Sequence, residues 1–417
     1  VHGRLARRLV FPHKPLGDTA MHAMEILRHT LTRSGCVLHK RRLHGLLQAV
    51  QAALAARSHT LSNLARALTG HTSVRHRVKC MDRLLGNTAL QRECSSIYRA
   101  LAAQMLSGCQ QPVILIDWTD LKADRSVQMI RASLALHGRS LCLLEQVYAG
   151  AEAATPEAHR RFLQQLRAIV GQQVRPILIT DAGFRAPWFA AVQQLGWHWL
   201  GRIRGRDLMR PAGDEQARWR SCRQVWATAS TTAVDLGAYE CVRSRPHVCR
   251  LVLIKHAPKG RHKRTVHGAV ARSKHSCKNA RAQTEPWLLA CSCSLQDLSA
   301  AAIVALYAQR MQIEQEFRDS KNARLGLGIE HSGTRSPERL AVLALIATLA
   351  QWVLHLLGQW AMQQGQQRHW QLTNRRVRPE LSVHRLGWLI AHVLDPPIEQ
   401  LREVIGRWTK PNMALRI

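Results

Sequence analysis

Residues 112–121, PVILIDWTDL, form an apolar, strand-like run that ends in acids. Two more strand-like runs follow directly, VQMIRASLALHG and RSLCLLEQVYAG (127–150), and a later apolar run, RPILITDAGF (175–184), again ends in an acid. A helical pattern near 156–170 separates these groups, and APWFAAVQQLG and WHWLGRIRG (186–205) then follow as helix and strand. Three meandering strands followed by alternating helix and strand predict a mixed α/β sheet.

Regions of different character surround this centre. Helical periodicity dominates the segment before it, a polar and basic segment with short strand-like pieces such as CRLVLIKH comes after it, and helical patterns return from residue 297 onward. The expected divisions are a leader, a helical N-terminal domain, the first part of the core, a β-rich basic insertion, the second part of the core and a C-terminal helical region: 1–20, 21–106, 107–205, 206–285, 286–365 and 366–417.

The leader, residues 1–20, is basic and contains two prolines. Helical periodicity begins at Met21, so we expect translation to start there. The leader would then lie upstream of the true start, or it is a disordered segment.

Composition points to a polyanionic partner. The chain of 417 residues carries 60 Lys and Arg against 27 Asp and Glu, a formal charge of +33. Nucleic acid is the favoured partner, because phosphate neutralisation with counterion release drives binding, and an anionic membrane surface is the weaker alternative. We find no apolar run of about 18 residues or more, and the 11 cysteines form no CxxC pair. The sequence therefore predicts a cytoplasmic protein without a membrane span or a structural zinc site.

Residues 60–87, TLSNLARALTGHTSVRHRVKCMDRLLGN, have the pattern of helix, glycine-containing turn and helix. Val74, Val78, Met81 and Leu85 recur at helical spacing and predict a buried stripe. A short helix, a tight turn and a basic second helix suit docking in a DNA major groove, and an ordinary helical hairpin with a solvated basic face is the alternative. The basic residues off the stripe are Arg75, Arg77, Lys79 and Arg83.

Two aspartates follow apolar runs, Asp117 in ILID and Asp181 in ILITD. Buried strands of α/β sheets commonly deliver functional side chains at their carboxyl ends. Such carboxylates can hold Mg²⁺, and a two-metal site that cleaves phosphodiesters needs a further carboxylate. Each aspartate alone is more simply a turn residue at a strand end. Both in a strongly basic chain favour a metal-dependent nuclease.

Three acids, Glu314, Glu316 and Asp319, lie in the basic helical stretch YAQRMQIEQEFRDSK (307–321). Glu316 points about 160° away from Glu314 around an ideal helix, and Asp319 about 140° away. Only Glu314 therefore shares a face with the aromatic residue and the bases, which suits an acid on a metal beside phosphate-binding cations. A surface helix with weak i,i+4 ion pairs is the alternative. The shared stripe comprises Tyr307, Arg310, Glu314, Arg318 and Lys321.

The spacing of Tyr307, Arg310, Glu314 and Lys321 resembles the YREK signature of DDE transposases from bacterial insertion sequences, in particular the hairpin-forming cut-and-paste family. Five short motifs match the pattern of that family, and the resemblance extends from about Met21 to the C-terminal helices. The motifs are LIDWTD (115–120), ALHGRSL (135–141), TDAGF (180–184), RMQIEQEFRD (310–319) and GLG (326–328).

The resemblance implies an RNase H-like catalytic core with a β-rich insertion, flanked by helical N-terminal and C-terminal regions. Asp117, Asp181 and Glu314 would be the DDE triad that binds two Mg²⁺ ions, for which Mn²⁺ can substitute. The other implied residues contact DNA: Tyr307, Arg310 and Lys321 bind phosphates of the transposon end, and Trp287 in EPWLLA stacks on a flipped base. Trp287 is otherwise a core aromatic. Some relatives carry a second Trp just after the motif arginine, where this chain has Met311.

The implied activity is metal-dependent cleavage at terminal inverted repeats, hairpin formation and opening, and attack of the 3′-OH on target DNA. The implied partners are transposon-end and target DNA, with a homodimer in the synaptic complex and a nucleoid-associated location. Two alternatives stay open. One is a non-catalytic DNA-binding protein derived from a transposase, and the other is a nuclease that does not recognise ends.

Overall fold

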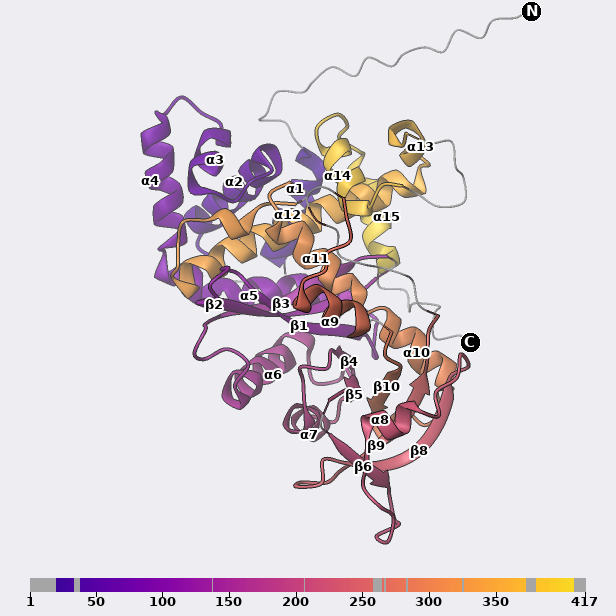
Figure 1. Ribbon diagram of the computed structural model, residues 1–417. Coiled ribbons are helices and arrows are strands. Elements are labelled where there is room, and N and C mark those ends of the chain that lie inside the picture. The colour runs from indigo at the N-terminus through magenta and orange to yellow at the C-terminus, as the bar shows by residue number, and fades with distance from the viewer. Residues whose placement is uncertain are drawn as a thin grey trace, which may run out of the picture.

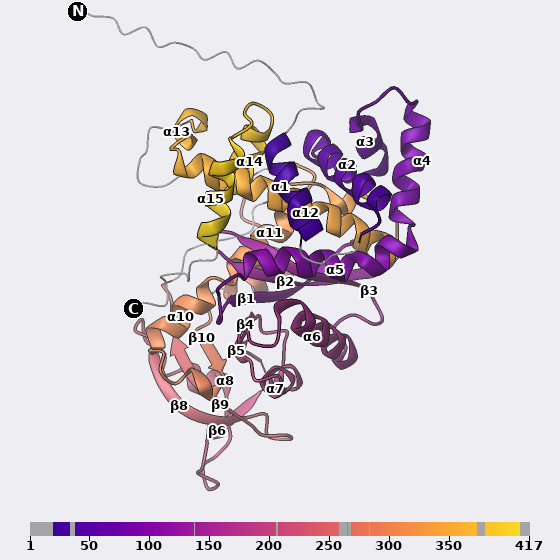
Figure 2. The same ribbon diagram turned by 180° about the vertical axis from the view of Figure 1, so that it is seen from behind.

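The computed structural model describes residues 20–408 except 34–37, 137, 206, 258–264, 266–267, 283, 325 and 373–379. The expected leader, apart from residue 20, lies outside the described residues, as do His137 of the ALHGRSL motif and part of the basic run between Lys255 and Arg281. Figure 1 shows a central sheet with helices on both faces, and Figure 2 shows the same layers from behind.

The N-terminal region is helical, as predicted. Its helices are α1 (Met21–Arg33), α2 (Lys40–Ala56), α3 (Leu61–Ala67), α4 (Val74–Leu85) and α5 (Thr88–Met105). Side chains cap several of these helices. The Thr60 and Ser73 hydroxyls accept from backbone N–H groups in the first turns of α3 and α4 and satisfy donors that have no partner inside the helix.

A single ten-stranded sheet runs through the rest of the molecule in the order β3-β2-β1-β4-β5-β10-β9-β8-β6-β7. β1, β4 and β5 are parallel, and β2 and β3 are antiparallel additions beside β1. The strands of the expected insertion continue the same sheet through β10. The bounds are β1 (Val113–Asp120), β2 (Val127–Ala135), β3 (Ser140–Ala149), β4 (Ile177–Thr180), β5 (His198–Ile203), β6 (Leu208–Pro211), β7 (Arg220–Ser221), β8 (Val234–Cys241), β9 (His247–Ile254) and β10 (Trp287–Cys291).

The remaining helices cover the sheet. α6 and α7 lie on one face and α12 on the other (Figures 1 and 2). Within the described part of the basic run between Lys255 and Arg281 lies a helix, α9. The bounds are α6 (Pro156–Val170), α7 (Ala186–Gln194), α8 (Cys222–Trp226), α9 (Lys274–Ala282), α10 (Ala300–Ala308), α11 (Met311–Lys321), α12 (Pro337–Gln363), α13 (Gln367–Trp370), α14 (Val383–Ala391) and α15 (Ile398–Trp408), with short 3₁₀ turns at Cys293–Leu295 and Ile329–His331.

α12 is the central helix of the helical layer. It is long and apolar enough to cross a membrane by length and composition, which corrects the expectation that the chain has no such run. Yet 94% of its most apolar window is buried inside the protein, as expected of a helix that is apolar on all sides. Gly358 lets α12 approach α14 closely, because a methyl group there would collide with the Val383 carbonyl oxygen. α12 is thus a core helix that α14 crosses at short range.

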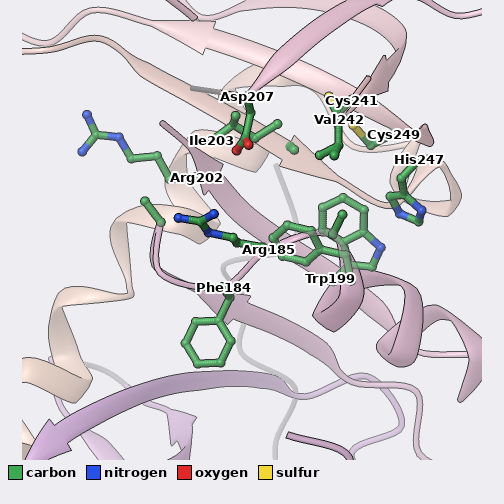
Figure 3. Close-up of a pocket in the computed structure, with 14 residues that line it drawn as sticks. Phe184, Arg185, Trp199, Arg202, Ile203, Asp207, Cys241, Val242, His247 and Cys249 are labelled. Carbon is green, nitrogen blue, oxygen red and sulfur yellow. Dashed lines mark hydrogen bonds between the residues drawn. The ribbon is translucent and has the colours of Figure 1, made fainter. Parts of the chain in front are cut away.

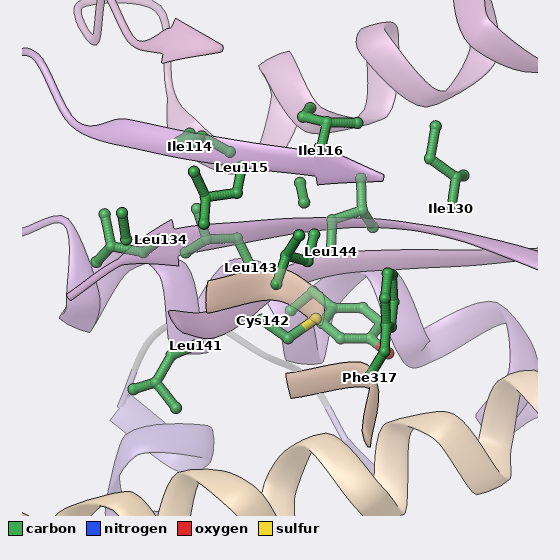
Figure 4. Packing of buried hydrophobic residues seen from close by; sticks show 14 of the residues in the cluster. Ile114, Leu115, Ile116, Ile130, Leu134, Leu141, Cys142, Leu143, Leu144 and Phe317 are labelled. Atoms are coloured by element: carbon green, nitrogen blue, oxygen red, sulfur yellow. The ribbon is translucent and has the colours of Figure 1, made fainter. Parts of the chain in front are cut away.

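Apolar side chains pack around β1, β2 and β3. Figure 4 shows side chains of β1, β2 and β3 packed together, with Phe317 of α11 against them. Ile114, Ile116, Leu143 and Leu144 are fully buried. Burial of each such side chain stabilises the fold by about 1.5–3 kcal/mol.

The α3–α4 hairpin forms as predicted, but the buried stripe is shorter. Met81 and Leu85 are buried, whereas Val74, at the first position of α4, is 45% exposed. The Arg77 side chain is not free in solvent. Its guanidinium donates to the carbonyl oxygens of Leu68, Gly70 and Thr72 and thereby holds the turn between the helices.

The stretch 307–321 is not one continuous helix. α10 ends at Ala308 and α11 begins at Met311, with tighter turns in between, because Arg310 N–H bonds to Tyr307 C=O and Ile313 N–H to Arg310 C=O. Tyr307 therefore belongs to α10 and Arg310 precedes α11. The interpretation of a single stripe from Tyr307 to Lys321 is wrong at its N-terminal end.

Candidate active site

Adjacent parallel strands bring Asp117 and Asp181 together. β1 pairs with β4 so that Ile116 is opposite Thr180, and the next residue on each strand is an aspartate. Neighbouring strands lie about 4.8 Å apart. Asp181 directly follows the last residue of β4, as predicted, whereas Asp117 lies inside β1, which continues to Asp120. The two carboxylates thus meet at one edge of the parallel part of the sheet.

Glu314 reaches this pair through Arg310. The Arg310 guanidinium lies 3.3 Å from the Asp117 carboxylate and donates a second bond to the Glu314 carboxylate. Asp117 and Arg310 are both 15% exposed at the side chain, and Glu314 is 42% exposed. Asp117 is also the direct cross-strand partner of Arg131 on β2, so both side chains project toward α11. The strand acids and the helix acid therefore face one another across a single arginine.

Electrostatic crowding is severe at Asp117. Burial, and then the negative charge of Asp181, raise the pKa of Asp117 to about 7, while Arg310 and the Trp118 N–H lower it. The Trp118 N–H donates to Asp117 Oδ1 at 2.8 Å. Burial lowers the pKa of Arg310, but Tyr307, Glu314 and Asp117 together raise it above its ordinary value. A cation is needed where these carboxylates meet, and Arg310 supplies one.

Tyr307 and Trp287 lie beside the acids. Trp287, the first residue of β10, has its ring centroid 5.0 Å from that of Tyr307, edge to face, and 4.4 Å from that of His256. Trp287 is half-buried, whereas Tyr307 is only 4% exposed. Burial raises the pKa of Tyr307 to about 12, and Arg310 and Arg202 act in the opposite direction. The structure thus places Trp287 beside Tyr307, and Tyr307 near Arg310.

Arg202 is a candidate that the sequence reasoning missed. It lies on β5 within the run WHWLGRIRG, where no motif distinguishes it and its positive charge is the one feature that could have pointed to a DNA contact. Its guanidinium donates to the Pro286 carbonyl oxygen at 3.2 Å, beside Trp287, and burial lowers its pKa. Its charge acts on both Tyr307 and Arg310, so it belongs to the same electrostatic group.

Lys321 and Arg318 lie in different surroundings in the structure. Lys321, the last residue of α11, donates to the Thr119 hydroxyl on β1 at 3.0 Å, two residues beyond Asp117. Burial lowers the pKa of Lys321. Arg318 is exposed and bonds to Gln315 of its own helix, so it is not brought to the carboxylates.

The bases predicted on the second helix of the hairpin remain apart from the carboxylate site. Arg75, Lys79 and Arg83 are all exposed on α4. α4 lies at the far end of the helical layer (Figures 1 and 2).

Glu316 and Asp319 turn away from Glu314, as helical geometry predicts, but they are not solvated. Glu316 is 1% exposed and lies 3.4 Å from the Arg131 guanidinium, which also binds Glu145 of β3. Asp319 bonds to His384 of α14 at 2.9 Å and to Arg139 at 3.2 Å. The alternative of a surface helix with exposed ion pairs is therefore excluded for these two acids, which anchor α11 in the core.

Gly183, two residues after Asp181, is in close contact with the Asp181 carboxylate. The Gly183 N–H donates to Asp181 Oδ1 at 2.8 Å, and a methyl group at Gly183 would lie 3.0 Å from the same oxygen. That separation is tighter than ordinary van der Waals contact. Glycine in TDAGF therefore lets the backbone hold the carboxylate without displacing it.

The carboxylates suit a divalent metal in their chemistry. Hard oxygen donors are the ligands that Mg²⁺ prefers, and burial, followed by the charge of Asp181, raises the pKa of the Asp117 carboxylate. Within the described ranges, however, no three His, Cys, Asp or Glu side chains converge on one point, because Arg310 stands between Asp117 and Glu314. Asp117 and Asp181 fit such an ion as they stand, and Glu314 fits once Arg310 releases it.

Carboxylates on neighbouring parallel strands, a glutamate on the facing helix and bases beside them define a class of protein, the enzymes that transfer phosphoryl groups of nucleic acids with carboxylate-bound metal. A family model described as transposase DDE domain matches residues 108–353. This match covers more than half of the chain, and the chain belongs to the DDE transposase domain family. It is a DDE transposase, an enzyme of metal-dependent phosphoryl transfer on DNA that uses divalent ions. No curated protein matches the chain.

Proposed function

We propose that this transposase moves its element by cut and paste, with Asp117, Asp181 and Glu314 as its DDE triad. The observation that carries this proposal is the meeting of the two strand aspartates with Glu314 across Arg310. The three residues come from distant parts of the chain, and each sits in a motif that resembles the hairpin-forming family.

The sheet supports an RNase H-like core. Strands β3, β2, β1, β4 and β5 are consecutive in the sheet, with β1, β4 and β5 parallel, and α11 brings Glu314 to them. The insertion is formed by β6 to β9, which continue the sheet beyond β10. The core and insertion boundaries stay those predicted from the sequence.

The chain's own residues divide the work at this site. The three carboxylates would hold two Mg²⁺ ions, with Mn²⁺ as a substitute, and the bound ions would supply activation of a water or 3′-OH and stabilisation of the leaving oxygen. Arg310 exchanges its carboxylate partners for a DNA phosphate when metal ions and DNA are bound at the site. Lys321 and Arg202 hold neighbouring phosphates.

Hairpin formation is supported by Trp287. Its half-exposed ring stands edge to face on Tyr307 and next to the acids, so it offers a stacking platform close to the scissile phosphate. A base flipped during hairpin formation would stack there. The four steps, namely end cleavage, hairpin formation, hairpin opening and strand transfer, are in-line phosphoryl transfers that one site can perform in turn.

The partners follow from this activity. The exposed bases of α4, Arg75, Lys79 and Arg83, contact the transposon-end repeat, and two chains pair two ends in a synaptic complex. The formal charge of +33 favours a location on the nucleoid in the cytoplasm.

The experiment that tests the triad uses DNA that carries the element's own terminal inverted repeats and Mg²⁺. We expect Asp117→Asn, Asp181→Asn and Glu314→Gln each to retain end binding and to lose cleavage by at least about 10³-fold, since each removes a charge on which the metal depends. Asp120→Asn, on the same strand as Asp117, is the matched control and should cleave normally. Cleavage that survives Glu314→Gln overturns the assignment.

A non-catalytic DNA-binding protein predicts no cleavage by the wild type under any metal condition. A nuclease without end recognition predicts equal cleavage of matched and scrambled ends. The proposed function requires metal-dependent cleavage that is faster on matched ends.

A further inference from the structure

A groove opens beside the second aspartate and is not used by the proposed end-DNA contacts. It has a volume of about 650 Å³ and is lined by the start of α6, by the loop from Gly183 into α7, and by the turn between β8 and β9. Figure 3 shows the neighbouring smaller cavity, where Phe184 and Arg185 lie on one side and Val242 and His247 on the other. Segments of the core and of the insertion thus build the groove together.

The charged side chains that line the groove are all positive. Arg160, Arg185 and Arg245 line it, and none of its described lining residues is Asp or Glu. Arg160 is paired with Glu157, which is outside the lining. In the part of the chain that the structure describes, Arg185 and Arg245 are exposed and take part in no ion pair. The groove therefore presents guanidinium groups whose charge is not compensated locally, as a phosphate backbone requires.

The groove runs up to the acids. Gly183 lines it, and the Gly183 N–H holds the Asp181 carboxylate at 2.8 Å. His159 also lines it and accepts a hydrogen bond at 3.1 Å from the indole N–H of Trp118, the residue next to Asp117. A strand that lies in the groove would therefore pass beside the Asp181 carboxylate and close to Trp118, which neighbours Asp117 on β1.

We propose that this groove binds the target DNA duplex through its phosphate backbone. Of the residues proposed to hold the transposon end beside the acids, Tyr307, Lys321 and Trp287 belong to α10, α11 and β10, and Arg310 directly precedes α11. The groove instead involves α6 and α7, which cover the face of the sheet away from α11 and α12 (Figures 1 and 2). Strand transfer requires a second DNA at the same acids, and the groove is a basic surface that approaches Asp181 from the other side of the sheet.

This inference rests on the proposed function, so the experiment separates the two. One variant carries Arg160→Gln, Arg185→Gln and Arg245→Gln. The matched control carries Arg161→Gln, Arg167→Gln and Arg175→Gln, which removes the same charge from exposed positions outside the lining. Arg161 is a close match for Arg160, because it is the next residue of α6, is equally exposed and also pairs with Glu157. Circular dichroism and thermal melting verify the fold of each protein.

Two reactions are measured for each protein, namely Mg²⁺-dependent cleavage of transposon ends and transfer of pre-cleaved ends into a plasmid target. We expect the groove variant to cleave ends at the wild-type rate but to need at least about 10 times more target DNA for half-maximal transfer. Three phosphate contacts account for a salt slope of about 2.7, so wild-type target binding should fall on the order of 40-fold more than that of the variant between 50 and 200 mM salt.

Equal target affinity of the groove variant and the control overturns the inference, as does an equal loss of end cleavage and transfer, which would assign the groove to donor DNA. If the wild type fails to cleave ends at all, the proposed function fails instead, and target binding measured directly by fluorescence anisotropy still tests the groove.

Discussion

Replacement of Arg131 by methionine should destabilise the protein strongly, because Arg131 is the one cation among two fully buried acids. The side chains of Arg131, Glu145 and Glu316 are 0%, 1% and 1% exposed. Their charges sum to −1, and the other partners of the acids are hydroxyl groups, those of Tyr98 and Thr348 on Glu145 and that of Ser140 on Glu316. Removal of Arg131 leaves two buried carboxylates with a charge of −2.

We expect Arg131→Met to lower the free energy of unfolding by about 3–5 kcal/mol, the range for breaking a buried ion pair from one side. Glu316→Gln should cost clearly less, since it leaves the neutral Arg131–Glu145 pair intact. The measurement is urea unfolding at pH 7, followed by tryptophan fluorescence and by circular dichroism, with coincident transitions required. A domain is stable by only about 5–15 kcal/mol, so the loss should be unmistakable.

The pH dependence gives a second, independent readout. Burial already raises the pKa of Glu145 in the wild type, and Arg131 opposes that effect. Without Arg131 the folded carboxylates bind protons more tightly than the unfolded ones. The stability of the variant should therefore rise as the pH falls from 7 toward the ordinary glutamate pKa of about 4.5, by up to about 1.4 kcal/mol per pH unit and proton taken up.

Equal costs for the two substitutions would refute this reasoning, and so would a loss below about 1 kcal/mol for Arg131→Met. A variant whose stability does not rise on mild acidification relative to the wild type would show that the carboxylates are not isolated from water.

Three further outcomes are expected. Gly358→Ala should cost about 1–3 kcal/mol in thermal unfolding through helix overpacking, whereas Gly406→Ala, where the added methyl meets open space, should not destabilise. Gly183→Ala should slow end cleavage about 10²-fold with DNA binding unchanged, because it displaces the carboxylate of Asp181, a member of the proposed triad, and Gly333→Ala is the neutral control. Burial lowers the pKa of His59 to about 4. The neutral, buried imidazole therefore stabilises the folded state fully above pH 6.5, and this contribution to the free energy of unfolding is lost as the pH falls toward 4. His59→Asn should remove roughly 3 kcal/mol of this acid sensitivity, as measured by urea unfolding at several pH values. No such difference in acid sensitivity would show that His59 reaches solvent in the folded state.

Local pattern was sufficient for most elements. The apolar runs around Asp117 and Asp181 became β1 and β4, and the helix–turn–helix of residues 60–87 became α3 and α4. These predictions succeeded because strand and helix periodicities of 2.0 and 3.6 are properties of short segments. The same limit explains the error at Tyr307, since a change to tighter turns between α10 and α11 leaves no mark in periodicity.

The match to the DDE transposase domain confirms the class of enzyme predicted from the motifs. The triad and the DNA contacts remain predictions, which the geometry supports unevenly. Arg310 and Lys321 approach β1, whereas Arg318 faces solvent.

The sequence by itself determined which acids and bases are available and which helical face Glu314 occupies, because residue identity and local spacing carry that information. Only the tertiary structure decided their partners. Glu316 meets Arg131 and Asp319 meets His384 because α11 packs between β2, β3 and α14, and these contacts join residues more than 60 positions apart. Likewise, α12 is a core helix and not a membrane span because other elements cover it on every side. Such pairings depend on which surfaces meet when distant segments pack, and no local pattern encodes that choice.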